Sequence, residues 1–334
     1  MADSTPENYI TSPTEIVSLA AIGIFGSLAP FIMPVIVGGI VDHLGVSLAE
    51  AGYVAFADMT GLGIGAILWS RLISTAHWRR FALLAVSLVI VGNIGCTLVD
   101  GFYSLMAARV VVGLGGGLML ALGNSGLTMT RDPDRTIGIV TVVGMLTASA
   151  ALFAFPLLIE ARGVNAVFYG MAIATGVAGL GVLRVPEYSP KKPAASDSQV
   201  LHAPLQGISV AALIGVFMFF LGAIIFWVYV ERIGNAAGYS VETIATVLGV
   251  SNLFGALGAI TPAVLSTRLG NRIVPVGSCI GLAVIASLTM AGNINVATFA
   301  VAACAFIFAC DCLYPYMMGL LISIDPDGRL VSYG

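Results

Sequence analysis

The stretch Arg109–Arg135, RVVVGLGGGLMLALGNSGLTMTRDPDR, determines how the rest of the chain is interpreted. Arg109 begins an uncharged run of about twenty residues, the length of a membrane-spanning helix, and a short charged loop ends it. An arginine at the centre of a bilayer costs roughly 3 kcal/mol or more unless it is paired or hydrated, which makes Arg109 a candidate functional residue. The glycines at Gly113, Gly115, Gly116 and Gly117 would let a neighbouring helix approach closely.

Two loops of the first half of the sequence recur in the second half. Arg131–Arg135 (RDPDR) resembles Asp325–Arg329 (DPDGR), and Trp78–Arg80 (WRR) resembles Gly270–Arg272 (GNR). The same offset in residue number separates the members of both pairs. This common spacing indicates a duplicated chain.

The composition predicts the class of protein. Hydrophobic residues make up 58% of the chain and charged residues 9%, against about 25% charged residues in a soluble domain. The sequence therefore predicts a polytopic membrane protein. The formal net charge is −3 and the basic residues are scattered, so nucleic acid is not expected as a partner. All five cysteines lie in apolar runs, which favours reduced packing residues over disulfides.

The apolar runs predict an all-α fold of ten membrane helices. They are expected at about residues 16–41, 48–72, 81–98, 103–127, 137–158, 166–183, 208–230, 243–265, 273–290 and 296–322. Residues 1–185 would form an N-terminal six-helix bundle, 186–205 a cytoplasmic linker, and 206–334 a C-terminal bundle. This second bundle would contain four helices. The duplication implies two more, so we expect the last two helices to be missing through truncation.

The basic residues predict the orientation in the membrane. If the N-terminus is cytoplasmic, only Arg162 and Arg232 lie in outer loops, while Arg109 lies within the membrane and the remaining lysines and arginines fall on the inner side. Positive charge in short loops favours the cytoplasmic side. We therefore expect a multi-pass protein of the cytoplasmic (plasma) membrane with its N-terminus inside.

Three motifs carry a resemblance to a known family. They are the basic pair Arg79-Arg80 after the second helix, Arg268-x-Gly270-x-Arg272 in the corresponding loop of the second half, and Arg109-x3-Gly113-x3-Gly117 in the fourth helix. Together they resemble the major facilitator superfamily (MFS) of secondary transporters over essentially the whole chain. The resemblance implies two six-helix bundles with inverted repeats and assigns these residues to the conformational change that opens each side in turn. We expect a monomer.

Asp58 and Arg109 are the first candidates for coupling transport to protons. At 1.5 Å per residue they lie about 15 and 9 Å below the outer surface, close enough in depth to pair. One interpretation is a protonatable carboxylate whose proton is exchanged against solute or conformation. The alternative is a permanent ion pair that only fastens two helices together. The sequence leaves both open.

Asp311, near the middle of the tenth helix, is the third candidate for proton coupling. Tyr314 and Tyr316 follow it and offer hydroxyl groups and ring faces to a solute. Phe217 and Phe220 lie at mid-depth in the seventh helix, where the alternatives are contact with lipid and contact with an apolar solute. These four aromatic residues are the predicted solute-binding residues. The alternative for Asp311 is a carboxyl group kept neutral by burial and hydrogen-bonded to a neighbouring helix.

The sequence favours a carrier over other classes of membrane protein. The glycine-rich run of the fourth helix lacks the Lys-Ser/Thr that ends an ATP-binding loop, and Cys310-x-Cys312 lacks a nearby histidine for a metal, so neither an enzyme nor a cofactor is expected. We expect a secondary active transporter of a small organic solute, coupled to protons and working by alternating access in the lipid bilayer. The alternative is a non-transporting solute sensor or an inactive truncated remnant.

Overall fold

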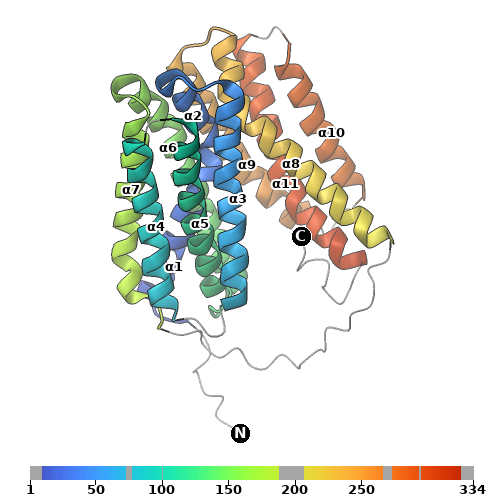
Figure 1. The fold of residues 1–334 in the computed structure, drawn as a ribbon. Helices are drawn as coiled ribbons and strands as arrows, with labels where there is room; N and C mark the ends of the chain where they lie inside the picture. The colour runs from blue at the N-terminus through green and yellow to red at the C-terminus, as the bar shows by residue number, and fades with distance from the viewer. Residues whose placement is uncertain are drawn as a thin grey trace. The chain divides into compact units, whose positions relative to one another are not determined.

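The computed structural model describes residues 10–72, 77–99, 101–187, 207–265, 273–292 and 295–324, and helices make up nearly all of this part (Figure 1). In chain order the elements are α1 (Pro13–Gly26), α2 (Leu28–Leu44), α3 (Leu48–Leu72), α4 (Trp78–Leu98), α5 (Phe102–Leu127), α6 (Pro133–Arg162), α7 (Asn165–Gly179), the 3₁₀ helix η1 (Leu180–Arg184), α8 (Gly207–Ala236), α9 (Val241–Leu265), α10 (Ile273–Met290) and α11 (Val296–Ile324).

The expected all-α, polytopic class is confirmed. Within the described residues, nine helical stretches are long and apolar enough to cross a membrane, and Pro275–Met290 is a shorter apolar helix. These ten segments correspond one by one to the ten helices predicted from the sequence. The agreement follows from the length of the apolar runs, because a bilayer requires about 20 consecutive apolar residues for a spanning helix.

The first membrane span consists of two helices, α1 and α2, which meet at Ser27. The break lies just before Pro30. Proline has no N–H, and its ring clashes with the carbonyl group four residues earlier, which here belongs to Gly26. The Ser27 N–H donates to the carbonyl oxygens of Gly23 and Ile24, at 3.1 and 3.2 Å, and these bonds close the last turn of α1.

The chain divides into two compact units. The first contains α1 to α5, α7, η1 and the two ends of α6, and the second contains residues 148–157 of α6 together with α8 to α11. The predicted linker, 186–205, lies almost wholly outside the described residues. The predicted division at 185 and 206 therefore stays a prediction.

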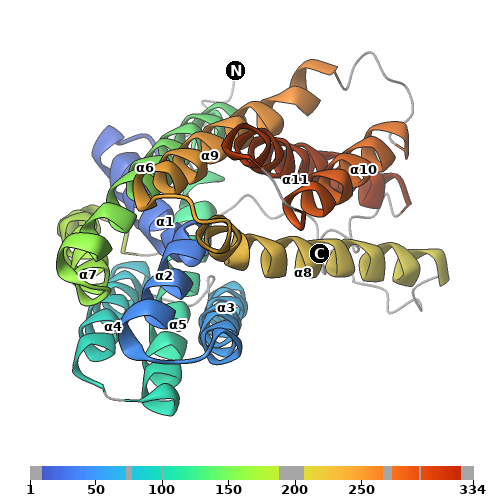
Figure 2. The same cartoon turned by 90° about the horizontal axis from the view of Figure 1, so that it is seen from above.

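In the first unit, α5 is the central helix and packs against α1, α3 and α4. Both views show α5 between α3 and α4 (Figures 1 and 2). Helices α1, α3 and α4 each contact α5 at one or more of its glycines. An added methyl group at Gly113 or Gly117 would overlap the backbone of α3, one at Gly115 the backbone of α4, and one at Gly116 the backbone of α1. Glycine at these positions therefore allows helix backbones to touch directly.

In the second unit, α11 packs mainly against α9 and α10. The contact with α9 is again made through glycine. A methyl group added at Gly258 would overlap the carbonyl oxygen of Phe308, and one added at Gly255 would overlap the carboxylate of Asp311. The acidic side chain of α11 thus lies directly against the backbone of α9.

Candidate functional site

A buried ion pair joins α3 to α5. Nη2 of Arg109 donates a hydrogen bond to Oδ2 of Asp58, and both residues are 0% exposed. Glycine at position 113 allows α3 and α5 to approach this closely, since a side chain at Gly113 would overlap the carbonyl oxygen of Asp58 itself. The pair that the sequence suggested from depth alone is present in the structure.

The arginine has further partners on α4 and α7 that the sequence analysis did not identify. Nη1 of Arg109 donates to Oδ1 of Asn93 at 3.4 Å, while Nδ2 of Asn93 donates to the carbonyl oxygen of Val89 at 2.9 Å. The thiol of Cys96, also on α4, lies close to the guanidinium of Arg109. The ring of Phe168 lies 5.9 Å from the guanidinium carbon, within the range of a cation–π contact. Asn93 is the one residue of α4 with an amide side chain, and this was the feature of the sequence that could have marked it as a partner of Arg109.

Two polar atoms of the ion pair have no hydrogen-bond partner among the described residues. They are Oδ1 of Asp58 and Nε of Arg109. Most buried polar atoms in proteins are hydrogen-bonded, so an exception in the middle of a membrane helix requires an explanation. The pair is therefore held at one oxygen and leaves the other oxygen of the carboxylate available for a proton or a ligand.

Asp311 belongs to the second unit. It is half-buried on α11, and no ion pair of Asp311 occurs within the part of the chain that the structure describes. Its carboxylate faces the backbone of α9 at Gly255. A role in proton coupling stays a prediction for this residue.

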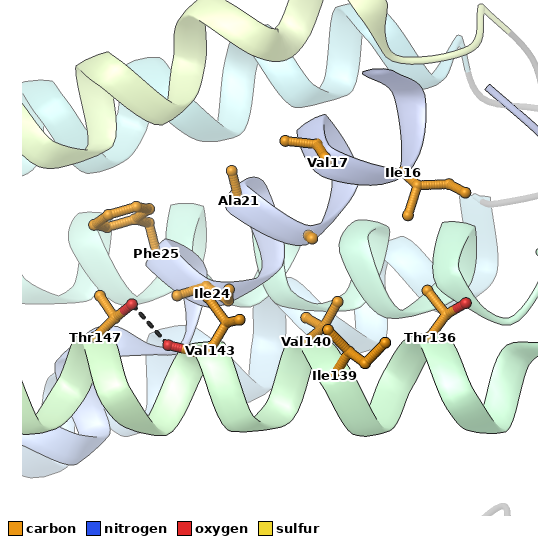
Figure 3. Close-up of a pocket in the computed structure, with 11 residues that line it drawn as sticks. Ile16, Val17, Ala21, Ile24, Phe25, Thr136, Ile139, Val140, Val143 and Thr147 are labelled. Carbon is orange, nitrogen blue, oxygen red and sulfur yellow. Dashed lines mark hydrogen bonds between the residues drawn. The ribbon is translucent and has the colours of Figure 1, made fainter. Parts of the chain in front are cut away.

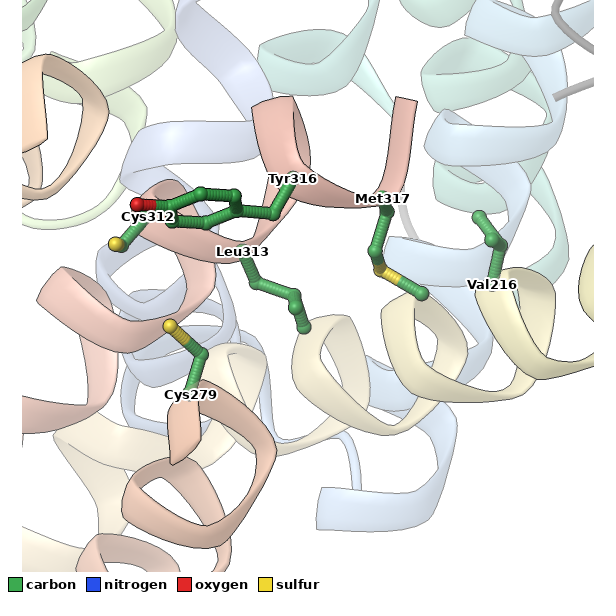
Figure 4. Packing of buried hydrophobic residues seen from close by; sticks show 6 residues of the cluster. All are labelled: Val216, Cys279, Cys312, Leu313, Tyr316 and Met317. Atoms are coloured by element: carbon green, nitrogen blue, oxygen red, sulfur yellow. The ribbon is translucent and has the colours of Figure 1, made fainter. Parts of the chain in front are cut away.

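The four aromatic residues predicted to bind solute separate into different environments. The rings of Phe220 and Tyr314 meet edge to face with centroids 5.9 Å apart. Tyr314 is 52% exposed and Phe217 61% exposed. Tyr316 is buried in a hydrophobic cluster whose members come from α8, α10 and α11 (Figure 4), namely Val216, Cys279, Cys312, Leu313, Tyr316 and Met317. Contact with a solute remains a prediction for all four.

The predicted gating residues have different contacts. Arg79 is bound to the segment after η1, where Nε donates to the carbonyl oxygen of Val185 at 3.2 Å and Nη1 lies 3.7 Å from Oε1 of Glu187. Arg80 is exposed. Gly113 and Gly117 form the contact between α5 and α3. The counterparts in the second half, Arg268, Gly270 and Arg272, lie outside the described residues.

An apolar pocket between α1 and α6 was not predicted from the sequence. It has a volume of about 440 Å³. Figure 3 shows α6 contributing residues at helical spacing, among them Thr136, Val140, Val143 and Thr147, while α1 contributes Ile24 and Phe25 among others. The hydroxyl groups of both threonines bond to carbonyl oxygens of their own helix or its cap, those of Asp132 and Val143. The lining is therefore almost entirely hydrophobic.

Comparison with known protein families identifies the family of this chain. Its sequence matches the family model described as Major Facilitator Superfamily over residues 16–330. The chain belongs to this superfamily. As a member of the Major Facilitator Superfamily, it is a membrane transport protein of the multi-pass class, and the family expected from its motifs is confirmed.

Solved structures show the same fold for this superfamily member. The crystal structure of the nucleoside transporter NupG has a TM-score of 0.74 at 13% identity, covering 96% of this chain and 85% of the other. A crystal structure of a point mutant of NupG has a TM-score of 0.71 at 13% identity, with coverages of 92% and 82%. No curated protein sequence matches the chain.

Proposed function

We propose that this superfamily member is a proton-coupled secondary transporter of a small, hydrophobic or amphipathic organic solute. It works as a monomer by alternating access in the plasma membrane, with its N-terminus in the cytoplasm. The observation that carries the proposal is the buried pair of Asp58 and Arg109 in which one carboxylate oxygen has no partner among the described residues. Asp311 is a second group that can carry a proton.

The free oxygen favours proton coupling over a purely structural ion pair. Among the described residues, no protein group donates a hydrogen bond to Oδ1 of Asp58. No protein donor therefore has to be displaced when a proton binds to this oxygen. A proton can bind at Oδ1 while Oδ2 keeps its contact with Arg109. The carboxylate can thus change charge without first separating α3 from α5.

The pocket between α1 and α6 supports the solute class. Its volume of about 440 Å³ lies within the roughly 300–1,000 Å³ typical of small-molecule sites. NupG is described as a nucleoside transporter, but a nucleoside has many polar groups and this lining offers few hydrogen-bonding partners. An apolar or amphipathic molecule fits the lining better.

Proton flux driven by solute tests the proposed function. The purified chain would be reconstituted in liposomes that contain a pH-sensitive dye, and amphipathic aromatic compounds, lipophilic cations, sugars and nucleosides would be added in turn. We expect a change of internal pH with at least one amphipathic compound and none in liposomes without protein. Solute exchange without proton movement would remove proton coupling from the proposal. Neither exchange nor proton movement with any compound would favour a sensor.

A pair of tryptophan substitutions tests the pocket in the same assay. Val143→Trp fills the pocket between α1 and α6, whereas Val177→Trp adds the same bulk on α7 at a side chain that is 63% exposed and outside the pocket. Val143→Trp should abolish the response to bulky solutes and Val177→Trp should retain it. Equal responses would show that the solute binds elsewhere.

The orientation can be checked by labelling single cysteines in a cysteine-free background. Asn165 and Asn235 are exposed at predicted outer ends of helices, and Thr128 is exposed at a predicted inner end. An impermeant thiol reagent added to intact cells should label Asn165→Cys and Asn235→Cys. It should not label Thr128→Cys or Ser196→Cys in the predicted linker. The reverse pattern would place the N-terminus outside.

A further inference from the structure

A small cavity lies where the broken first span meets Asp58. Gly26 and Ala29 border it from either side of the break, Asp58 from α3, Gly116 from α5 and Met171 from α7. Its volume of about 10 Å³ is near the smallest space, roughly 10–15 Å³, that holds one water molecule. The cavity is therefore too small for a transported solute and close to the size of a single water.

Two hydrogen-bond acceptors at this cavity have no ordinary partner. The first is Oδ1 of Asp58, which is fully buried and unpartnered among the described residues. The second is the carbonyl oxygen of Gly26, because the residue four positions later is Pro30 and has no N–H to donate. This oxygen faces Gly116, where an added Cβ would lie 2.9 Å from it. Both acceptors belong to residues that line the same cavity.

We propose that one structural water molecule occupies this cavity and donates one hydrogen bond to Oδ1 of Asp58 and the other to the carbonyl oxygen of Gly26. Buried waters typically satisfy such polar groups and make about three hydrogen bonds, within a range of two to four. The water joins the carboxylate of α3 to the break between α1 and α2. Neither residue can make this connection directly, since each offers only an acceptor.

A water fits this cavity better than a metal cation. Hard cations such as Ca²⁺ take about six to eight oxygen ligands, and a cavity near the size of one water has no room for such a shell. The titratable and charged groups nearest to Asp58 are Arg109 on α5 and Cys96 on α4. The guanidinium of Arg109 already neutralises the carboxylate, so a second cation would be repelled.

The water links protonation of Asp58 to the break between α1 and α2. This role of the water rests on the proposed function. A proton bound at Oδ1 of Asp58 turns that oxygen from an acceptor into a donor. The water must then rotate and accept from the carboxyl group, which changes its bond to Gly26. Protonation is thereby communicated to the break in the first span. The presence of the water does not depend on transport and can be tested separately.

Hydroxyl-radical footprinting of the purified chain tests for the water directly. Irradiation produces radicals from a bound water in place, and these oxidise adjacent side chains even when bulk solvent cannot reach them. Met171 lines the cavity at 3% exposure, and Met33, which is 1% exposed and does not line it, is an internal reference. We expect Met171 to be oxidised several-fold faster than Met33. Equally slow oxidation of both residues would overturn the proposal.

Three variants of the first span test whether the water bridges the two groups. Ala29→Val fills the cavity, and Pro30→Ala supplies an N–H to the carbonyl oxygen of Gly26. Pro34→Ala restores an N–H one turn further on, away from the cavity, and is the matched control. Oxidation of Met171 should fall to the level of Met33 in the first two variants and stay unchanged in the third.

The outcomes of this series distinguish the presence of a water in the cavity from its hydrogen bond to Gly26. Unchanged oxidation in Ala29→Val would show that no water in the cavity is its source. Loss in Ala29→Val with full retention in Pro30→Ala would show a water that is not held by Gly26, which contradicts the bridge. Thermal unfolding of each variant identifies any that fails to fold. Because no solute or proton gradient is involved, failure here leaves the proposed transport to be judged by the flux assay.

Discussion

Arg109→Gln should both destabilise the protein and abolish transport driven by a pH gradient. The substitution leaves the carboxylate of Asp58 fully buried without its positive partner. Removing one member of a buried ion pair costs about 3–5 kcal/mol of stability. Asp58→Asn should cost a similar amount, since it strands the guanidinium. Thermal unfolding in detergent and solute accumulation in proteoliposomes measure the two effects.

The double variant Asp58→Asn/Arg109→Gln separates stability from coupling. With neither charge of the pair left in the interior, it should recover most of the lost stability. It should still fail to accumulate solute against a gradient, because the group that exchanges the proton is gone. Glu187→Gln is the control, since it breaks the exposed pair with Arg79 and should cost less than about 1 kcal/mol. A stable double variant with full proton-driven accumulation would show that the pair is only structural.

The second large effect is expected from Gly65→Ala on α3. A methyl group at Gly65 overlaps the carbonyl oxygen of Leu114 on α5, so the two helices must move apart. Overpacking of this kind typically costs about 1–3 kcal/mol. It should also weaken transport, because the same interface brings Asp58 to Arg109. The unfolding temperature and the proton-flux assay are the measurements.

Gly63 provides the matched control within the same helix. Nothing lies within 4 Å of a Cβ placed at Gly63 in the described part of the chain, and alanine is favoured over glycine in a helix interior by roughly 0.5–1 kcal/mol. Gly63→Ala should therefore leave the unfolding temperature unchanged or raise it. If both alanine variants behave alike, the glycines of α3 do not act through contact with α5.

Sequence reasoning could predict those features that depend on one helix at a time. The apolar runs predicted each membrane span found in the described residues, and the similar depth of Asp58 and Arg109 suggested their pairing. The direction in which each side chain points could not be derived. Gly63 and Gly65 are equivalent in the sequence, yet of these two only Gly65 touches α5.

Features that depend on several helices at once were missed for the same reason. Asn93 meets Arg109 only because α4 packs against α5 at that level. The apolar pocket between α1 and α6 arises from the space that two packed helices leave between them, and each lining side chain is ordinary for a membrane helix. The break at Ser27, by contrast, lies just before Pro30, and a bend of the first span at this proline is predicted from the sequence alone.

The position of Cys96 makes it a built-in reporter of how often the first unit opens. Cys96 is 2% exposed and lies close to Arg109, so an alkylating reagent that crosses the membrane can reach it only when α4 separates from the helices packed against it. The rate at which the Cys96 peptide gains mass, followed by mass spectrometry, therefore measures the frequency of that separation in the unmodified protein. A solute that changes this rate reveals its binding before any substrate has been identified by transport.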